Sequence, residues 1–205
     1  RVILVDGRGR VQPADRTLVL LVRHLLREAP GASVVYDLKS SSIVAEEVTA
    51  AGGVPIMERP GHTFIKGRLL AENAILAGEL SGHYFFRATR GDDALYATLL
   101  FLHVLDRLDA TLAEAIDTVP AYPSTPDIRV PCSAERARPI FEELQEGLAD
   151  YSISTLDGVR VQFPDGWALV RQSVTEPVIT LRFEALSREA LEEIQHQVRE
   201  ASPLL

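Results

Sequence analysis

The chain has 205 residues, of which 46% are hydrophobic and 24% charged, and its formal net charge is −8. These values are typical of a globular protein, while the acidic balance and the lack of a basic tract argue against nucleic acid as a partner. No apolar run approaches the roughly 20 residues that span a bilayer, so we expect no membrane partner. A single cysteine, Cys132, excludes an internal disulfide and suits the reducing cytoplasm, where we expect the protein. Since the chain starts with Arg1 and its only methionine is Met57, we also expect a further segment upstream.

Strand and helix signals alternate through the first part of the chain. Residues 2–5 (VILV) predict a short strand before a tight turn, and Pro13 opens an apolar-periodic helix that runs through Leu26. The next signals, in chain order, are a strand at 34–38, a serine-capped helix within 40–53, a strand at 54–58, a helix at 63–74, a strand at 83–88 and a helix at 92–108. This alternation predicts an α/β domain over residues 1–118, a mixed sheet with helices on both faces.

A proline-rich stretch separates this part from the rest. Four prolines fall within residues 119–131, which predicts a linker at 119–126. The signals that follow are a strand at 128–130, a helix at 134–148, strands at 152–157, 158–163, 167–173 and 178–185, and a last helix with Ser187 as its N-cap. Consecutive strands flanked by helices predict a smaller α+β domain with an antiparallel sheet over 127–205.

The stretch GELSGHYFF (residues 78–86) carries polar side chains at alternate positions. In an extended segment Glu79, Ser81 and His83 would point the same way, and their mixed donors and acceptors suit the hydroxyls of a sugar. A polar turn before a strand explains the pattern equally well. A third interpretation is a metal-dependent hydrolase using Glu79 and His83, for which no third ligand is evident.

Three other positions are candidates for anion contacts. In RQSVTEP (171–177), Arg171, Ser173 and Thr175 alternate and would form a phosphate cradle with the backbone amides of a turn, or simply an exposed strand end. Lys39 and His62 lie near strand ends and helix starts, where ligands gather in open α/β folds. Their alternative roles are a surface lysine and a capping or core histidine.

Six motifs, in this order, resemble the C-terminal half of an α-D-phosphohexomutase of the phosphomannomutase/phosphoglucomutase kind. They are RVILVDGRGRV, YDLKSS, GHTFIK, GELSGHYFF, TLDGVRV and RQSVTEPVITLRFEA, and the resemblance covers nearly the whole chain. It implies that residues 1–118 are the α/β third domain and residues 127–205 the fourth domain, an α+β unit with a fold like that of the TATA-binding protein.

The resemblance also implies roles for nine residues. It gives Glu79, Ser81 and His83 in a sugar-binding loop, Lys39 and His62 as further substrate contacts, Arg171, Ser173 and Thr175 in a phosphate-binding loop, and Arg1 as the end of a metal-binding loop. We call residues 78–83 the sugar loop and residues 171–177 the phosphate loop. Val174 departs from the family pattern, which usually has asparagine there, so one side-chain hydrogen bond to phosphate would be lost.

In such enzymes a phosphoserine and Mg²⁺ shift a phosphate between the 1 and 6 positions of a hexose, mannose or glucose, through a hexose 1,6-bisphosphate. The phosphoserine loop is absent here, and the metal-binding aspartates would precede Arg1. The resemblance therefore implies that the chain binds hexose phosphate, holds no catalytic nucleophile and no complete metal site, and needs N-terminal domains 1 and 2 for turnover. The alternative is a stand-alone, non-catalytic module that binds sugar phosphates.

Overall fold

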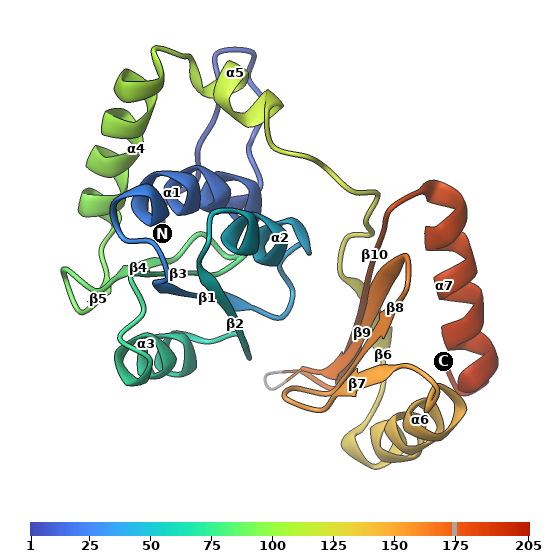
Figure 1. Ribbon diagram of the computed structural model, residues 1–205. Coiled ribbons are helices and arrows are strands. Elements are labelled where there is room, and N and C mark those ends of the chain that lie inside the picture. Colours follow the sequence, from blue (N-terminus) through green and yellow to red (C-terminus); the bar gives the residue numbers. More distant parts are fainter. Residues whose placement is uncertain (174–175) are drawn as a thin grey trace. The chain divides into compact units, whose positions relative to one another are not determined.

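The chain folds into two compact units, Arg1–Ala121 and Tyr122–Leu205. The computed structural model describes residues 1–173 and 176–205 (Figure 1). The division between the units falls inside residues 119–126, the stretch that the sequence predicts as a linker.

The first unit contains a five-stranded mixed sheet. In sheet order its strands are β2 (Val54–Glu58), β1 (Ser33–Asp37), β3 (Leu76–Gly78), β4 (Tyr84–Phe86) and β5 (Gly91–Asp92). β2, β1 and β3 run parallel, whereas β4 and β5 continue the sheet in antiparallel pairs. Parallel neighbours end at one edge of a sheet, so the carboxyl ends of β1 and β3 lie side by side.

Helices cover both faces of this sheet, as predicted. α1 (Ala14–Glu28) and α2 (Ile43–Ala50) lie on one face, and α3 (His62–Ala71) lies on the other (Figure 1). α4 (Ala94–Leu108) and α5 (Leu112–Asp117) pack against α1. Under α3, the core joins Ile65 and Leu69 to sheet residues such as Val35 and Phe85, all of them almost completely buried.

The N-terminal segment differs from the prediction. Residues 2–5 form no strand; they are one arm of a hairpin with a single bridge between Val5 and Val11. The turn is held by the buried carboxylate of Asp6, which accepts the backbone N–H of Arg8 at 2.9 Å. The apolar signal of this arm was misleading because Ile3 and Val5 remain exposed, 56% in the case of Val5, and Val2 and Leu4 are only half-buried.

Other differences concern short elements. β3 and α5 were not predicted, because three and six residues are too few to establish a periodic pattern. A serine, Ser42, occupies the N-cap of α2 as predicted, but its side chain makes no capping hydrogen bond. In its place Ser41 Oγ accepts the N–H of Ile43 at 3.3 Å.

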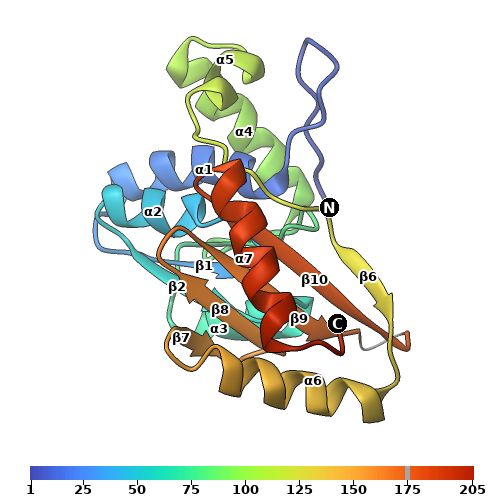
Figure 2. The ribbon, with the colours of Figure 1, turned by 90° about the vertical axis from the view of Figure 1, so that its right-hand side faces the viewer.

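The second unit is a five-stranded antiparallel sheet covered on one face by two helices. In sheet order the strands are β6 (Ile128–Pro131), β10 (Val178–Ala185), β9 (Gly166–Gln172), β8 (Val159–Phe163) and β7 (Ser152–Ser154). α6 (Ala134–Gly147) and α7 (Arg188–Ala201) pack against this sheet, and Figure 2 shows α7 running across it. This arrangement confirms the α+β prediction.

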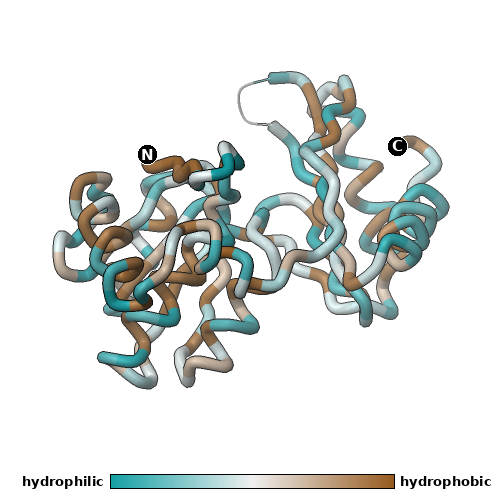
Figure 3. The backbone as a smooth tube through the Cα atoms, turned by 90° about the horizontal axis from the view of Figure 1, so that it is seen from above, coloured by the Kyte–Doolittle hydropathy of each residue, from teal (hydrophilic) through white to brown (hydrophobic). Residues whose placement is uncertain are grey.

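Alternation explains how this sheet buries one face. On β8, Val159, Val161 and Phe163 belong to the core that also holds Ile194 and Val198 of α7. In Figure 3 the helices near the C-terminus are mostly hydrophilic with apolar positions between, as expected of helices with one face on the core. Of the helices in the described part of the chain, none has the length and apolar character needed to cross a membrane.

Gly158 provides a test of the second unit. Its φ is +81°, and a Cβ atom there would lie 2.3 Å from Val170 O and 2.7 Å from Arg171 Cα. Backbone atoms cannot rotate away, so Gly158→Ala should lower the free energy of unfolding by about 3 kcal/mol. Urea unfolding followed by the fluorescence of Trp167, the only tryptophan, measures this unit selectively because the side chain is buried in it.

The matched control is Gly67→Ala. Gly67 lies inside α3, and a Cβ atom there would meet nothing within 4 Å. This substitution should stabilise the helix by about 0.5–1 kcal/mol and leave the Trp167 transition where it was. An unchanged Trp167 transition in Gly158→Ala would contradict our view of this contact.

Candidate active site

The candidate site lies where β1 and β3 end at the same edge of the first sheet. Tyr36 of β1 pairs with Gly78 of β3, so Asp37 and the sugar loop begin level with each other. Asp37, only 2% exposed, accepts the backbone N–H of Leu80 at 2.7 Å and that of Lys39 at 2.8 Å. One buried carboxylate therefore fixes both the turn that carries Lys39 and the start of the sugar loop.

Glu79 is a second buried carboxylate at this edge. Its Oε2 accepts the hydroxyl of Ser81 at 3.0 Å, while its buried Oε1 has no hydrogen-bond partner among the described residues. Burial raises the pKa of Asp37, the N–H groups that it accepts oppose that shift, and the charge of Glu79 adds to it. A buried acceptor without a partner among the described residues is able to accept from a bound molecule, and a sugar hydroxyl is one such donor.

The sugar loop is a turn, so the prediction of an extended segment is wrong. The N–H of Gly82 donates to Glu79 O at 2.9 Å, and that of Glu79 to His83 O at 3.0 Å. Gly82 has a φ of +85°, and a Cβ atom there would lie 2.7 Å from Val2 O. Alternation along the chain therefore does not align the three side chains. Ser81 instead binds Glu79 through the turn, and His83 points to a different partner.

That partner is Asp92, which binds two histidines at once. Its Oδ2 lies 2.9 Å from His83 Nδ1, and its Oδ1 lies 2.8 Å from Nε2 of His62, the first residue of α3. Arg1 Nε donates to His83 Nε2 at 3.1 Å. His62 and the sugar loop are therefore linked through Asp92.

Sequence reasoning missed Asp37 and Asp92. Asp37 ends a buried strand, and a carboxylate at that place is a recognisable signal for a functional edge. Asp92 lies in RATRGDD (87–93), and only the pairing of β5 with β4 brings it back beside His83. No local sequence pattern indicates that the chain folds back in this way.

The phosphate loop starts at Arg171, near the end of β9. Arg171 Nε donates to Asp157 Oδ2 at 2.8 Å, and both side chains are mostly buried. The N–H of Ser173 donates to Val178 O at 2.9 Å, and Ser173 Oγ accepts the N–H of Glu176 at 3.3 Å. Thr175 and Val174 lie outside the described residues. Asp157 thereby fixes the Nε edge of the Arg171 guanidinium, a group whose terminal nitrogens are able to donate to an anion.

The metal interpretation lacks a ligand set. Within residues 1–173 and 176–205, no group of three or more His, Cys, Asp or Glu side chains is placed to hold a metal ion. Glu79 and His83, the two ligands considered from the sequence, bind different partners, Ser81 and Asp92.

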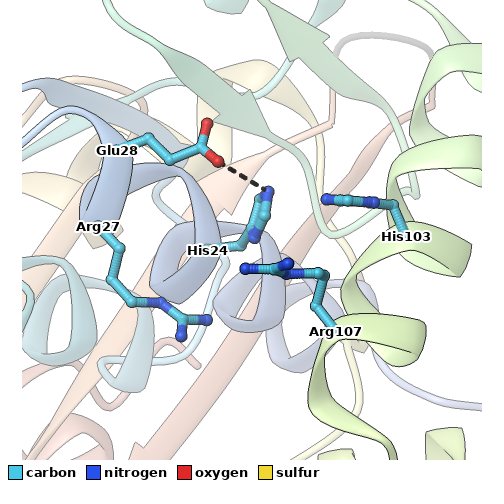
Figure 4. Close-up of a pocket in the computed structure, with 5 residues that line it drawn as sticks. All are labelled: His24, Arg27, Glu28, His103 and Arg107. Atoms are coloured by element: carbon cyan, nitrogen blue, oxygen red, sulfur yellow. Dashed lines mark ion pairs between the residues drawn. The ribbon is translucent and has the colours of Figure 1, made fainter.

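A separate polar pocket of about 430 Å³ lies between the C-terminal ends of α1 and α4 (Figure 4). It is lined by His24, Arg27 and Glu28 of α1 and by His103 and Arg107 of α4. The arginines lie in the last turn of each helix, where cations complement the helix dipole. Burial lowers the pKa of His24, and His103 and both arginines lower it further against the opposing charge of Glu28, 3.8 Å away.

Asp37 can be tested directly. Asp37→Ala removes the acceptor of two backbone N–H groups, so the free energy of unfolding should fall by about 2–4 kcal/mol. Hydrogen exchange should locate the loss, because the amides of Leu80 and Lys39 lose their protection. Retained protection at Leu80 would show that the sugar loop does not depend on this carboxylate. Ser152→Ala, a change at an exposed position in the other unit, serves as the control.

The lowered pKa of His24 predicts how the free energy of unfolding depends on pH. Its pKa is lower in the folded chain than the ordinary 6.5, so folding favours the neutral ring. Its contribution to stability is complete above pH 6.5 and is lost as the pH falls through and below that value, by at most about 1.4 kcal/mol per pH unit. His24→Gln should therefore flatten the decline in the free energy of unfolding below pH 6.5, as measured by urea titrations followed by circular dichroism. An identical slope in both proteins would refute this role.

Comparisons with known proteins agree with this geometry. The family model described as phosphoglucomutase/phosphomannomutase, alpha/beta/alpha domain III, matches residues 13–122. The model described as the phosphoglucomutase/phosphomannomutase C-terminal domain matches residues 128–201. The two matches fall on the two units in turn.

Individual relatives give the same result. The chain is 38% identical over 207 residues to a phosphoglucomutase of Neisseria gonorrhoeae, a match that covers 97% of this chain and 44% of the relative. It is 37% identical over 199 residues to a phosphomannomutase/phosphoglucomutase of Pseudomonas syringae pv. tomato, with 95% and 43% covered. A crystal structure of a phosphoglucomutase/phosphomannomutase family protein from Burkholderia thailandensis matches with a TM-score of 0.87 and 36% identity, covering 98% of this chain and 43% of that one.

The chain thus spans less than half the length of the curated relatives that it matches. Over that span the order of domains, the folds of both units and the ordered motifs all agree with one family. The chain belongs to the phosphoglucomutase/phosphomannomutase family, and it carries the third and the C-terminal domains.

Proposed function

We propose that this chain is the sugar- and phosphate-binding part of a cytoplasmic phosphohexomutase, which interconverts hexose 1-phosphate and hexose 6-phosphate of mannose, glucose or both. The first unit would hold the sugar and the second unit a phosphate group. The observation that carries the proposal is the buried Oε1 of Glu79, an acceptor without a partner among the described residues, at the edge where Asp37 fixes the sugar loop.

The first unit supports recognition of hydroxyl groups. Glu79 and Ser81 form one polar pair, and His62 and His83 add ring nitrogens beside it. Lys39 follows β1 at the same edge and would contribute a cation. Mixed acceptors and donors held on the ends of strands, with little freedom to reorient, are suited to binding vicinal hydroxyls.

The second unit supports recognition of phosphate. Arg171 is a guanidinium held at its Nε by Asp157, which orients the rest of the fork. Ser173 adds a hydroxyl next to it, and Thr175 would add another. Such a grip fits the phosphate that does not react, and it would orient the reacting end of the sugar toward the nucleophile.

The remaining chemistry would come from N-terminal domains 1 and 2. These would supply the phosphoserine and the Mg²⁺ ligands, and the reaction would pass through hexose 1,6-bisphosphate. Mg²⁺ would neutralise the charge of the transferring phosphoryl group. Arg1, which contacts His83, is the residue of this chain that would adjoin the metal-binding loop.

The alternative function is a stand-alone module that binds sugar phosphates without turnover. A mutase assay of this chain, with and without N-terminal domains 1 and 2, distinguishes the two functions. Turnover that appears only when both halves are present supports the mutase. Binding of hexose phosphate with no turnover in any combination supports the module.

Arg171 provides the direct test of phosphate recognition. Arg171→Ala should weaken the binding of glucose 1-phosphate and mannose 1-phosphate by roughly 10- to 100-fold, the equivalent of about 1.5–3 kcal/mol for hydrogen bonds to a charged group. Calorimetric titration of the chain measures the change. Arg138→Ala is the control, because Arg138 is an exposed arginine of α6 whose ion-pair partner among the described residues is Glu142. Equal affinities for all three proteins would contradict the proposal.

A further inference from the structure

We propose that the polar pocket between the C-terminal ends of α1 and α4 binds a small dicarboxylate, with one carboxylate at Arg27 and the other at Arg107 (Figure 4). None of the candidate substrate-binding residues lines this pocket. The inference is therefore independent of the proposed function, and it assigns a second ligand site to the first unit.

The pocket has the size and the accessibility of a small-molecule site. Its volume of about 430 Å³ lies within the range of roughly 300–1,000 Å³ that is usual for ligand pockets. His24 is its buried member, and the ring of His103 lies edge-on to it with the ring centroids 5.3 Å apart. The other three lining residues are exposed, so a ligand reaches the pocket from solvent and contacts both helices.

Both arginines of the pocket have terminal nitrogens that are free to bind an anion. Arg27 Nε donates to the backbone oxygen of Arg23 at 2.9 Å, which ties one edge of the guanidinium to α1. Neither Arg27 nor Arg107 has an ion-pair partner among the described residues. In Figure 4 the two guanidinium groups extend toward each other, one from each helix.

The carboxylate of the pocket does not neutralise these arginines. Glu28 lies 3.8 Å from Nε2 of His24 and forms no ion pair with Arg27 or Arg107. The pKa of His24 reflects the positive surroundings: burial lowers it most, and His103 and both arginines lower it further against the charge of Glu28. A local excess of positive charge in a chain with a net charge of −8 favours an anionic ligand.

The helix dipoles decide what kind of anion fits. Arg27 and Arg107 lie in the last turns of α1 and α4, where the helix dipole attracts cations and disfavours anions. Complementing a dipole requires only the positive charge of each side chain and leaves the terminal nitrogens unused. An anion at this place must overcome the negative helix ends, so a ligand held by one arginine should bind much more weakly than a ligand held by both.

Two guanidinium groups on different helices match two carboxylates of one molecule. A guanidinium pairs with a planar carboxylate through two parallel N–H···O bonds, which fixes its orientation as well as its position. A dicarboxylate offers one such group to each arginine. A hexose 1-phosphate carries a single anionic group and would engage only one of them, so we expect no measurable binding of hexose 1-phosphate here.

Titration of the ¹⁵N-labelled chain with succinate at pH 7.0, followed by NMR, tests the proposal. We expect saturable shifts of the amides of Arg27 and Arg107 and of the rings of His24 and His103. Acetate at twice the concentration supplies the same number of carboxylates, yet it should bind about 10-fold more weakly or worse. Sodium chloride at equal ionic strength should give no saturable shift. In saturating succinate the pKa of His24 should rise, because a nearby anion stabilises the protonated ring.

Variants of the two arginines locate the site. Arg27→Gln and Arg107→Gln should each weaken succinate binding by about 10-fold or more, since each removes the partner of one carboxylate. Arg68→Gln is the matched control, because Arg68 also lies in the last turn of its helix, α3, but pairs with Glu72 at 3.3 Å. Its affinity for succinate should be unchanged, and circular dichroism should show that all three variants are folded.

Several results would overturn the proposal. They are the absence of saturable shifts with succinate, equal binding of acetate, an unchanged affinity in both arginine variants, and an unchanged pKa of His24 in saturating succinate. Shifts confined to residues 171–173 would place succinate at the phosphate loop and would also overturn it. Because no sugar phosphate is used, each of these results leaves the proposed function untouched.

Discussion

The hydrogen bond from Leu80 N–H to the buried carboxylate of Asp37 is the interaction on which the candidate site depends. Parallel pairing brings the ends of β1 and β3 to one edge, but the pairing of β3 with β1 stops at Gly78, where the sugar loop begins. At that point the carboxylate of Asp37 accepts the backbone N–H of Leu80, two residues after Gly78, at 2.7 Å. Since a buried carboxylate is costly unless its oxygens are satisfied, the loop and the carboxylate stabilise each other.

Two kinds of polar group make up the candidate site: groups whose atoms are hydrogen-bonded by the chain itself, and a buried acceptor with no partner among the described residues. Asp37 and Asp92 have their oxygens engaged by N–H groups of the chain itself. Glu79 Oε1 is the buried acceptor left over, with no partner among the described residues. A site with a satisfied supporting layer and unsatisfied outer atoms is organised before the ligand arrives, which lowers the cost of binding. Arg171 and Asp157 repeat the same division in the second unit.

The sequence was sufficient for the architecture. Of its candidate site residues, Ser81 hydrogen-bonds to Glu79, and His62 and His83 share Asp92 as a partner. Long periodic segments such as α1 and α7 follow from their spacing, and Ser187 caps α7 as predicted by accepting the N–H of Ala190. The conformation of the sugar loop could not be predicted, because Gly82 adopts a positive φ that depends on a contact with Val2, 80 residues earlier. The place of Asp92 could not be predicted either. Asp92 lies beside His83 because β5 pairs with β4, and no local sequence pattern indicates that pairing.

The most direct measurement of the central claim is an NMR titration of the ¹⁵N-labelled chain with glucose 1-phosphate. We expect saturable shifts of the amides of Leu80 and Gly82, accompanied by a shift of the His83 ring, because the sugar hydroxyls would bind beside them. Residues of the pocket between α1 and α4, such as Arg107, should not respond. Saturation at Ser173 with no response in residues 79–83, or shifts confined to the α1–α4 pocket, would contradict the assignment of the sugar site.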